Sequence, residues 1–301
     1  MIVTKITGGM GNQMFMYALG FALAEKHHTK MLLDLSGLTN GERIYAMDKF
    51  KITYKEIWNP GRVLQLYYQF IRKFGLCEVQ KKIAVILRHF IGNRSLILIA
   101  EKSISFDTDI LLLPDNVLLD GYWMTSKYFS SVEEKLRKEF RWRYEVSQNT
   151  KYWEKIIRSC ECAVSLHVRR GDYVSNNENK SLYCQLGNEY YYAAVDFLKK
   201  NNKSMVLFVF SNDVNWCKEN LQFSNMTYYV SGNDEQHGHE DMYLMSLCTH
   251  NIVANSTFSW WGAWLNSNSD KTVVCPKKYY NVQNSWFDSE EDIWPSDWIK
   301  I

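Results

Sequence analysis

The sequence predicts an α/β fold, in which helices cover both faces of mostly parallel β-sheets. Short apolar runs typical of strands alternate regularly with helical patterns through residues 162–275, as in a doubly wound sheet. The N-terminus has the same order, because IVTKIT is followed by a long helical run and then by KMLLDL. The length of 301 residues suits two domains, since one domain usually holds about 100–200 residues.

The first half contains a β-α-β unit by its pattern. Residues 53–94 are helical or irregular, and the pattern assigns no clear element there. The serines at the start of SSVEEKLRKEF predict the cap of a helix. The elements expected in order are a strand at 2–7, the turn GGMGNQ, a helix at 14–27, strands at 30–35 and 117–123, and a helix at 130–140.

The second half alternates strands and helices more regularly. The expected strands are 162–168, 205–211, 226–231, 251–254 and 272–276, and the helices between them are 188–200, 214–221, 239–250 and 258–266. The domain boundary is expected near residues 147–152, which gives domains 1–150 and 151–285 and a tail at 286–301. Because parallel strands end at the same edge of a sheet, the loops after these strands should converge.

Composition excludes several classes of protein. The net charge of +2 provides no polybasic field for nucleic acid, so no nucleic-acid partner is expected. The seven cysteines are scattered without a CxxC pair, which indicates reduced thiols in a cytoplasmic protein. There is no signal-peptide pattern and no apolar run long enough to span a bilayer. The basic run KKIAVILRHF allows a peripheral membrane contact, but a helix with a solvated basic face is the favoured interpretation.

Two arginines follow the apolar run CAVSLHV. Arg169 and Arg170 therefore stand at the carboxyl end of a predicted core strand, where a doubly wound sheet binds its ligand. A guanidinium group is planar and always charged, and it matches the geometry of phosphate oxygens. An ion pair with carboxylates is the alternative. The position and the doubling of the arginines favour a phosphate group.

The stretch NSTFSWWGAWLN offers a second anion site. Ser256 and Thr257 precede an apolar helix, and hydroxyls and free N–H groups at a helix start bind anions. Taken alone, this motif is better explained as an ordinary N-cap. We expect its three tryptophans to be buried in the core on this helix and not to form a platform for a sugar. Beside the arginine loop, the two hydroxyls become candidate ligands of a diphosphate.

The turn GGMGNQ resembles a dinucleotide-binding fingerprint, and Asp34 follows it in the sequence at about the spacing of the acid that binds a ribose in such folds. Met14 replaces the third glycine, however, so a tight turn is favoured. Asn12 and Gln13 would then offer amides to a polyhydroxylated ligand. A nicotinamide-dependent oxidoreductase therefore remains one possible class of function. The aromatic content of 15% allows another class, a sugar-binding protein without enzymatic turnover.

Two patterns invite a metal hypothesis. Asp107-Thr-Asp109 is a DxD sequence, which some glycosyltransferases use to bind a metal ion. Residues 237–241, HGHED, contain possible ligands, but their spacing matches no standard zinc pattern. We interpret both as helix caps, and no metal site is predicted.

The residues HVRRGDY, at 167–173, resemble the HxRRxD motif of the α-1,2-, α-1,6- and protein O-fucosyltransferases. The blocks GGMGNQMFMYALG, LDGYWMTSKYF, EDMYLMS and NSTFSWWGAWLN look like those of the bacterial α-1,2-fucosyltransferases of glycosyltransferase family eleven, and the tail DIWPSDWIKI is similar too. The blocks run through the whole chain in the expected order. They are specific together, although none is specific alone.

The resemblance implies a GT-B-like architecture of two facing Rossmann-like domains. It implies that domain 1–150 receives the acceptor, that domain 151–285 binds GDP-β-L-fucose, and that the tail 286–301 packs back across both. The reaction would be an inverting transfer of L-fucose to the 2-hydroxyl of a terminal β-galactose in a glycan, without a cofactor or an essential metal. A bacterial cytoplasmic enzyme is implied. Another linkage or another acceptor remains an alternative.

The same resemblance assigns roles to residues. Arg169 and Arg170 would bind the diphosphate and stabilise charge on the leaving group. His167 and Asp241 match positions for guanine and ribose, since a carboxylate accepts two N–H donors from guanine. The phosphate-side loop would be Ser256, Thr257 and Phe258.

The other domain would contribute Asn12 and Gln13 to the same site. The catalytic base stays open between two carboxylates. A related class uses a Glu shortly after HxRRxD, and Glu178 stands beside that place, which Asn177 occupies. Asp172 is the other candidate.

Overall fold

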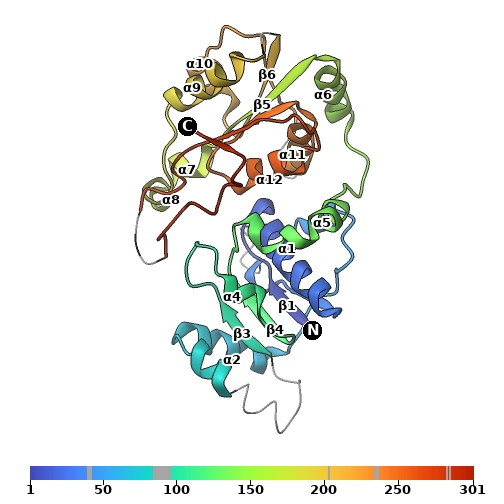
Figure 1. The fold of residues 1–301 in the computed structure, drawn as a ribbon, viewed down its shortest axis with the longest axis vertical. Coiled ribbons are helices and arrows are strands. Elements are labelled where there is room, and N and C mark those ends of the chain that lie inside the picture. Colours follow the sequence, from blue (N-terminus) through green and yellow to red (C-terminus); the bar gives the residue numbers. More distant parts are fainter. Residues whose placement is uncertain (39–42, 84–95, 203, 234–236, 283, 285) are drawn as a thin grey trace. The chain divides into compact units, whose positions relative to one another are not determined.

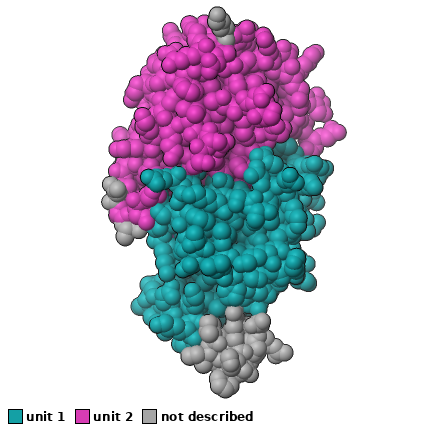
Figure 2. All heavy atoms as spheres, viewed as in Figure 1, with its two compact units in different colours: residues 1–143, 291–293 teal, residues 144–290, 294–301 magenta. Residues whose placement is uncertain are grey.

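A computed structural model of the chain describes residues 1–38, 43–83, 96–202, 204–233, 237–282, 284 and 286–301 (Figure 1). These residues form two compact units, which Figure 2 colours separately. Unit 1 comprises residues 1–143 and 291–293, and unit 2 comprises residues 144–290 and 294–301. The tail therefore contributes residues to both units. The division of donor and acceptor roles between domains 1–150 and 151–285 stays a prediction.

Unit 1 is built on a four-stranded sheet with the order β2-β1-β4-β3, in which every pairing is parallel. Its strands are β1 (Ile2–Lys5), β2 (Met31–Asp34), β3 (Ile97–Ala100) and β4 (Val117–Asp120). Its helices are α1 (Met10–His27), α2 (Arg62–Lys73), α4 (Thr108–Leu111) and α5 (Glu133–Glu139), with short 3-10 turns η1 (Ser36–Leu38), η2 (Met47–Lys49), η3 (Ser126–Tyr128) and η4 (Ser130–Val132).

Helix α1 is the central helix of unit 1. It is apolar on all sides and buried almost throughout residues 13–24, as expected for a helix enclosed by other elements. Helix α2 packs only part of its surface, since Tyr68 and Ile71 contact Val3 and Leu118 of the sheet. Residues 77–83 are also helical. The rest of the amphipathic run that starts at Lys81 lies outside the described residues.

The expected serine cap at 130–140 is wrong. The two serines form η4, and α5 begins after it at Glu133 without a side-chain cap. The hydroxyl of Ser130 instead donates to the backbone oxygen of Lys127 at 3.3 Å. The first residues that the pattern assigned to the helix, Ser130–Val132, therefore form a separate 3-10 turn.

Unit 2 is built on a six-stranded parallel sheet with the order β7-β6-β5-β8-β9-β10. Its strands are β5 (Cys162–Val168), β6 (Met205–Ser211), β7 (Thr227–Tyr229), β8 (His250–Ile252), β9 (Val273–Cys275) and β10 (Ile299–Lys300). Its helices are α6 (Gln148–Ser159), α7 (Gly171–Ser175), α8 (Asn177–Leu182), α9 (Asn188–Lys199), α10 (Val214–Asn220), α11 (Gly238–Leu247) and α12 (Thr257–Leu265). Three strands lie on each side of the β5–β8 junction, which is the strand order of dinucleotide-binding folds.

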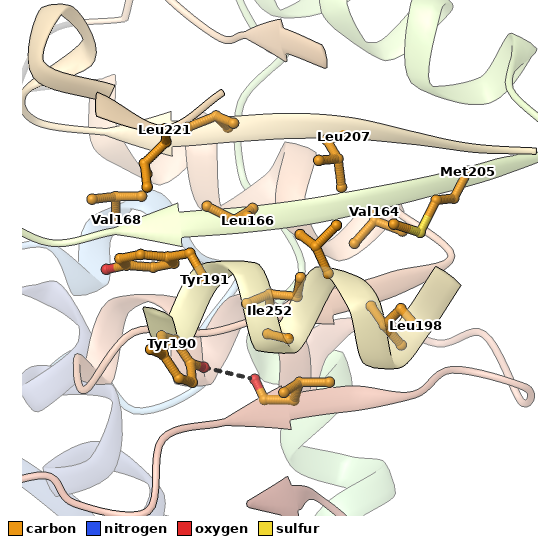
Figure 3. Close-up of a cluster of buried hydrophobic side chains, with 14 of the residues drawn as sticks. Val164, Leu166, Val168, Tyr190, Tyr191, Leu198, Met205, Leu207, Leu221 and Ile252 are labelled. Atoms are coloured by element: carbon orange, nitrogen blue, oxygen red, sulfur yellow. Dashed lines mark hydrogen bonds between the residues drawn. The ribbon is translucent and has the colours of Figure 1, made fainter. Parts of the chain in front are cut away.

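Both faces of the unit 2 sheet are covered. Alternate residues of β5 point to opposite faces, so Val164, Leu166 and Val168 pack on α9, as Figure 3 shows. The hydroxyl of Tyr190 on α9 donates to the backbone oxygen of Val253 at 2.5 Å and ties the helix to the sheet (Figure 3). Ala163 faces the other way, into a cluster with α6 and α11. The expected doubly wound α/β class is confirmed.

Candidate active site at the carboxyl edge of the second sheet

Strand order places the candidate site of unit 2 between β5 and β8. These strands are neighbours, with Leu166 opposite Ile252, and the chain leads away from them in opposite directions across the sheet. Ligands of such sheets bind outside the carboxyl ends of the strands at this switch point. The loop after β5 begins with Arg169, and the loop after β8 leads through Asn255 to α12.

The loops after β5 and β8 contact each other directly. The hydroxyl of Tyr173 donates to the backbone oxygen of Asn255 at 3.1 Å. The side-chain amide of Asn255 donates to the backbone oxygens of Cys184 and Tyr279 at 2.8 and 2.9 Å. The ring of His167 lies 5.5 Å from that of Phe258, measured between centroids. Both motifs singled out in the sequence are therefore brought to one edge.

Arg170 is held by the loop that follows β6. Its guanidinium carbon lies 3.7 Å from the centre of the Trp216 ring, and its Nε lies 3.4 Å from Oδ2 of Asp213. Its backbone N–H donates to Oδ1 of Asn212 at 3.0 Å. A cation stacked on an indole and paired with a carboxylate has few alternative positions. This guanidinium group is therefore preorganised.

Arg169 has a different environment. Its guanidinium carbon lies 5.4 Å from the centre of the Tyr173 ring. The next residue but one, Gly171, has φ +30°, and a Cβ there would come within 2.0 Å of Nδ2 of Asn212. The turn after the two arginines therefore needs glycine.

His167 is the last buried polar side chain of β5 before the arginines. Burial, and then the positive charge of Arg169, lower the pKa of His167 to about 3, so its ring is neutral at physiological pH. Its Nδ1 is buried and has no hydrogen-bond partner among the described residues. Buried polar atoms are normally paired, and a bound ligand is one source of the missing partner.

Asp241 lies in the first turn of α11. Burial raises its pKa to about 6, although a hydrogen bond from Nδ2 of Asn233 at 2.7 Å acts in the opposite direction. The start of α11 is near the site, because a Cβ on Gly238 would lie 3.8 Å from the ring of Phe258. A mostly buried carboxylate with a raised pKa near such an edge is typical of a functional group.

Glu240, beside Asp241, has a structural role that the sequence did not reveal. Its carboxylate accepts from the hydroxyls of Ser147 and Thr150, both at 2.5 Å, and from the Ser147 backbone N–H at 3.0 Å. Burial acts to raise the pKa of Glu240, but these hydrogen bonds lower it overall. The carboxylate thus joins the start of α11 to the start of α6.

The phosphate-side loop has the geometry of an ordinary helix cap. The hydroxyl of Ser256 accepts from the backbone N–H of Phe258 at 3.4 Å and caps α12. Thr257 begins the helix and is half-buried. The expectation that the tryptophans of this stretch are core residues is confirmed, since Trp260, Trp261 and Trp264 are all buried. Anion binding by Ser256 and Thr257 stays a prediction.

The two candidates for the catalytic base differ in what the structure describes. The side chain of Asp172 lies outside the described part of the chain. Glu178 is exposed on α8, where its backbone N–H donates to Oδ1 of Asn176 at 2.9 Å. The choice between them stays a prediction.

The two amide residues predicted to bind ligand in unit 1, Asn12 and Gln13, differ in burial. Gln13 is buried; its Nε2 donates to the backbone oxygens of Gly8 and Ile44, and its Oε1 accepts from Ala46. Its amide thus anchors the glycine turn. Asn12 is half-buried. A binding role for either residue stays a prediction.

Sequence reasoning missed a buried acid at the carboxyl edge of the unit 1 sheet. Glu101 follows β3, and its carboxylate accepts from the backbone N–H groups of Tyr122 and Trp123 at 2.6 and 2.8 Å. Burial raises the pKa of Glu101 to about 7 against the effect of these hydrogen bonds. Trp123 has φ +58°, a conformation that bulky residues rarely adopt. The only available signal was a Glu directly after the apolar run LILIA.

The two sequence patterns that suggested a metal site lie at the starts of helices α4 and α11. Asp107 caps α4, because Oδ1 of its side chain accepts from the backbone N–H of Asp109 at 2.9 Å. His237 stands at the cap position of α11 without a side-chain bond to it. Within the part of the chain that the structure describes, no three His, Cys, Asp or Glu side chains are grouped to hold a metal ion.

Comparison with known proteins decides the family. Residues 85–301 match the family described as Glycosyl transferase family 11. The chain belongs to glycosyltransferase family 11. It is 31% identical to an alpha-1,2-colitosyltransferase of Escherichia coli, across 100% of this chain and 98% of that relative. It is also 30% identical to the O-antigen biosynthesis glycosyltransferase WbnK of the same organism, across 93% and 95%.

More distant relatives of this family 11 chain include mammalian proteins. The galactoside alpha-(1,2)-fucosyltransferase 1 of Mus musculus is 27% identical over 49% of this chain and 41% of that relative. A structure of the α-1,6-fucosyltransferase NodZ soaked with GDP-fucose has a TM-score of 0.52 at 13% identity, covering 88% and 91% of the two chains. A mutant of Arabidopsis thaliana FUT1 in complex with GDP has a TM-score of 0.50 at 12% identity, covering 90% and 69% of the two chains. The expected GT-B-like α/β fold is confirmed by these likenesses.

Proposed function

We propose that this family 11 glycosyltransferase transfers L-fucose from GDP-β-L-fucose to the 2-hydroxyl of a terminal β-galactose. The observation that carries the proposal is the pair Arg169 and Arg170 at the switch point of unit 2, beside the neutral His167. Positive charge at the end of a parallel strand suits the diphosphate of a nucleotide sugar. The names of the α-1,2-linking relatives support the linkage.

The donor would be bound by groups from three loops of unit 2, those after β5, β7 and β8. Asp241 would accept the N–H donors of guanine, and Arg169 and Arg170 would bind the diphosphate. The fixed position of Arg170 on Trp216 suits a group that must meet developing charge without moving. On the phosphate side, the N-terminus of α12, which Ser256 caps, would add its backbone N–H groups.

The reaction would be a single displacement with inversion. A carboxylate, Asp172 or Glu178, takes the proton from the acceptor hydroxyl, and the hydroxyl oxygen attacks C1 of fucose. The bond between C1 and the phosphate oxygen breaks, and the electron pair leaves with GDP. The arginines stabilise the negative charge that develops on the diphosphate.

The acceptor would bind to unit 1, which corresponds to the expected acceptor domain 1–150. The switch point of its sheet lies between β1 and β4, so the turn at 8–13 and the loop at 121–123 share one edge. Tyr122 is 39% exposed there, and a tyrosine ring suits the apolar face of a galactose. Glu101 fixes the backbone of this loop.

Colitose is a second candidate for the transferred sugar. The relative with 31% identity over the whole chain is a colitosyltransferase. Colitose is L-fucose without its 3-hydroxyl, so the two donors share the GDP moiety and most of the sugar. The identity of the donor therefore depends on a contact with one hydroxyl group, and competition between GDP-fucose and GDP-colitose measures it.

A GDP-release assay tests the proposal. The purified protein is incubated with GDP-fucose and either lactose or lacto-N-biose, with and without EDTA, and the product linkage is determined by NMR. We expect GDP release only with acceptor, an α-1,2 product and no effect of EDTA. Sugar binding without GDP release would favour a binding protein. Thermal stabilisation by NADH but not by GDP would favour the oxidoreductase alternative.

A further inference from the structure

Helix α2 presents an exposed apolar face that the proposed reaction does not use. Val63 and Phe70 of this face are 84% and 52% exposed, and Phe74, just past the end of α2, is 58% exposed. Each member has another member three or four residues away, so they form one continuous stripe along the helix. We call this stripe the α2 apolar face, and it consists of Val63, Leu66, Tyr67, Phe70 and Phe74.

The inner side of the same helix is already packed. Tyr68 and Ile71 contact the unit 1 sheet, and the hydroxyl of Tyr68 donates to the backbone oxygen of Leu96 at 3.3 Å. Nε of Arg72 lies 3.1 Å from Oδ2 of Asp120, at the end of β4. Figure 1 shows α2 beside β3. The α2 apolar face is therefore a second, outward side of a helix whose position is already fixed.

Basic residues border the apolar face. Arg62 and Lys73 are exposed on one flank of α2, and Lys81 and Lys82 are exposed on the helical residues 77–83. The only acid between residues 61 and 83 is Glu78, whose Oε1 lies 2.9 Å from Nζ of Lys102. Val79 and Ile83 add further exposed apolar area beside these lysines.

We propose that the α2 apolar face, with its basic border, binds the surface of a membrane that contains anionic lipids. An exposed apolar stripe with aromatic residues and a cationic border is the pattern of a helix that lies in the plane of a lipid interface. No described helix is long and apolar enough to cross a membrane. The proposal is independent of the sugar transferred.

Charge decides against a second copy of the chain on this face. A symmetric contact would bring the same surface of two copies together, with Arg62, Lys73 and the two lysines on both sides. Like charges across an interface oppose association. Anionic head groups offer the complementary charge, and the acyl region accepts the apolar side chains.

Vesicle flotation tests the proposal with the full chain. We expect binding to phosphatidylcholine vesicles with about 30% phosphatidylglycerol, little binding without the anionic lipid, and weaker binding at about 0.5 M salt. The double variant V63S/F70S should lose about 10-fold to 100-fold in binding because it removes apolar area that would enter the interface. The matched control is Leu112→Ser, since Leu112 is 73% exposed elsewhere in unit 1.

Folding and oligomeric state are checked in parallel. V63S/F70S should keep the wild-type circular dichroism spectrum and the wild-type rate with a soluble acceptor. The proposal is overturned if the wild-type protein floats with neither vesicle, or if V63S/F70S floats like wild type. It is also overturned if light scattering finds a wild-type dimer that V63S/F70S loses while no vesicle binding occurs.

Discussion

Arg169 and Arg170 are neighbours in the chain, yet their guanidinium groups have different surroundings. Arg170 stacks on Trp216 and lies close to Asp213, whereas Arg169 lies beside Tyr173. Stacking on an indole requires the planar guanidinium group, which lysine does not have. The two positions therefore differ in how well lysine should replace arginine.

The alanine variants of both arginines should lower kcat. Loss of one electrostatic donor to the leaving group typically costs about 10²–10³ in rate, so each variant should lose roughly that factor. Arg170→Lys should recover little, because its ammonium cannot reproduce the stacked geometry. Steady-state kinetics with GDP-fucose measure this, and Arg158→Ala, an exposed arginine on α6, serves as the control. Wild-type turnover in both alanine variants would refute the assignment.

GDP binding should weaken at acidic pH because of Asp241. Its pKa in the free protein is about 6, and only the ionised carboxylate accepts both N–H groups of guanine. As pH falls below this value, the protonated fraction rises and the Kd for GDP should increase up to about 10-fold for each pH unit. Calorimetric titration between about pH 5 and pH 8 measures the effect.

The control for this pH profile is Asp241→Asn. The terminal phosphate of GDP also titrates near pH 6, so the variant supplies the part of the profile that does not come from Asp241. The raised pKa means that the carboxyl group contributes stability at low pH and loses it as pH rises through about 6. Asp241→Asn should therefore stabilise the ligand-free protein more at neutral pH than at pH 4. Parallel profiles in both proteins would exclude a role for Asp241.

Single residues show how far the sequence alone can reach. Arg169 was placed at a strand end correctly, because the strand pattern of residues 162–168 is local. Glu101 and Glu240 could not be recognised, since their partners lie 21 and 93 residues away in the chain. Only the folded chain brings such groups together. A buried acid therefore looks like any surface acid in the sequence.

The β5–α7 turn is the element on which the arginine loop depends. Gly171 has φ +30°, and any Cβ there would overlap the side chain of Asn212. The overlap should displace Asn212 from the backbone N–H of Arg170, to which it is bonded at 3.0 Å. The loop geometry and the binding of the donor are thus linked through one glycine.

Gly171→Ala should therefore reduce donor binding. A strained backbone position costs about 1–3 kcal/mol, so we expect a loss of roughly 5-fold to 100-fold in kcat/KM for GDP-fucose. Gly75→Ala is the matched control, because Gly75 also has a positive φ, +64°, lies outside the proposed donor and acceptor sites, and a Cβ there would meet nothing within 4 Å. Kinetics and thermal melting of both variants are compared. Equal kcat/KM values in the two variants would contradict the assignment of the turn.

Elements were predictable where their pattern was long and periodic. The seven-residue strands β5 and β6 agree with the expected ranges, and the strand–helix alternation led to the correct class. The two-residue strand β10 was not predicted, because it exists only by pairing with β9. The short helices α7 and α8 were not among the expected elements, because their stretch is rich in Asn, Ser and Glu and has no long apolar period.

At the scale of the whole molecule, the two units give the proposal a sharp test. A ligand stabilises the unit that binds it, by about 2.7 kcal/mol when its concentration is about 100 times Kd. If GDP binds at the β5–β8 switch point, the added stability should be confined at first to unit 2. The sheet of unit 1 has its own switch point at the GGMGNQ turn, where the oxidoreductase alternative would place a dinucleotide.

Hydrogen exchange with and without GDP should locate the nucleotide. We expect slower exchange in the loop at 169–175, at 255–258 and in the first turn of α11, because these backbone groups surround the proposed diphosphate and guanine positions. Residues 62–73 should exchange equally in both states, since α2 belongs to the other unit and has no part in donor binding. Arg170→Ala should reduce the protection in unit 2 at equal GDP concentration. Protection confined to residues 8–13 and 121–123 would instead place the nucleotide on unit 1, and the donor site proposed here would have to be abandoned.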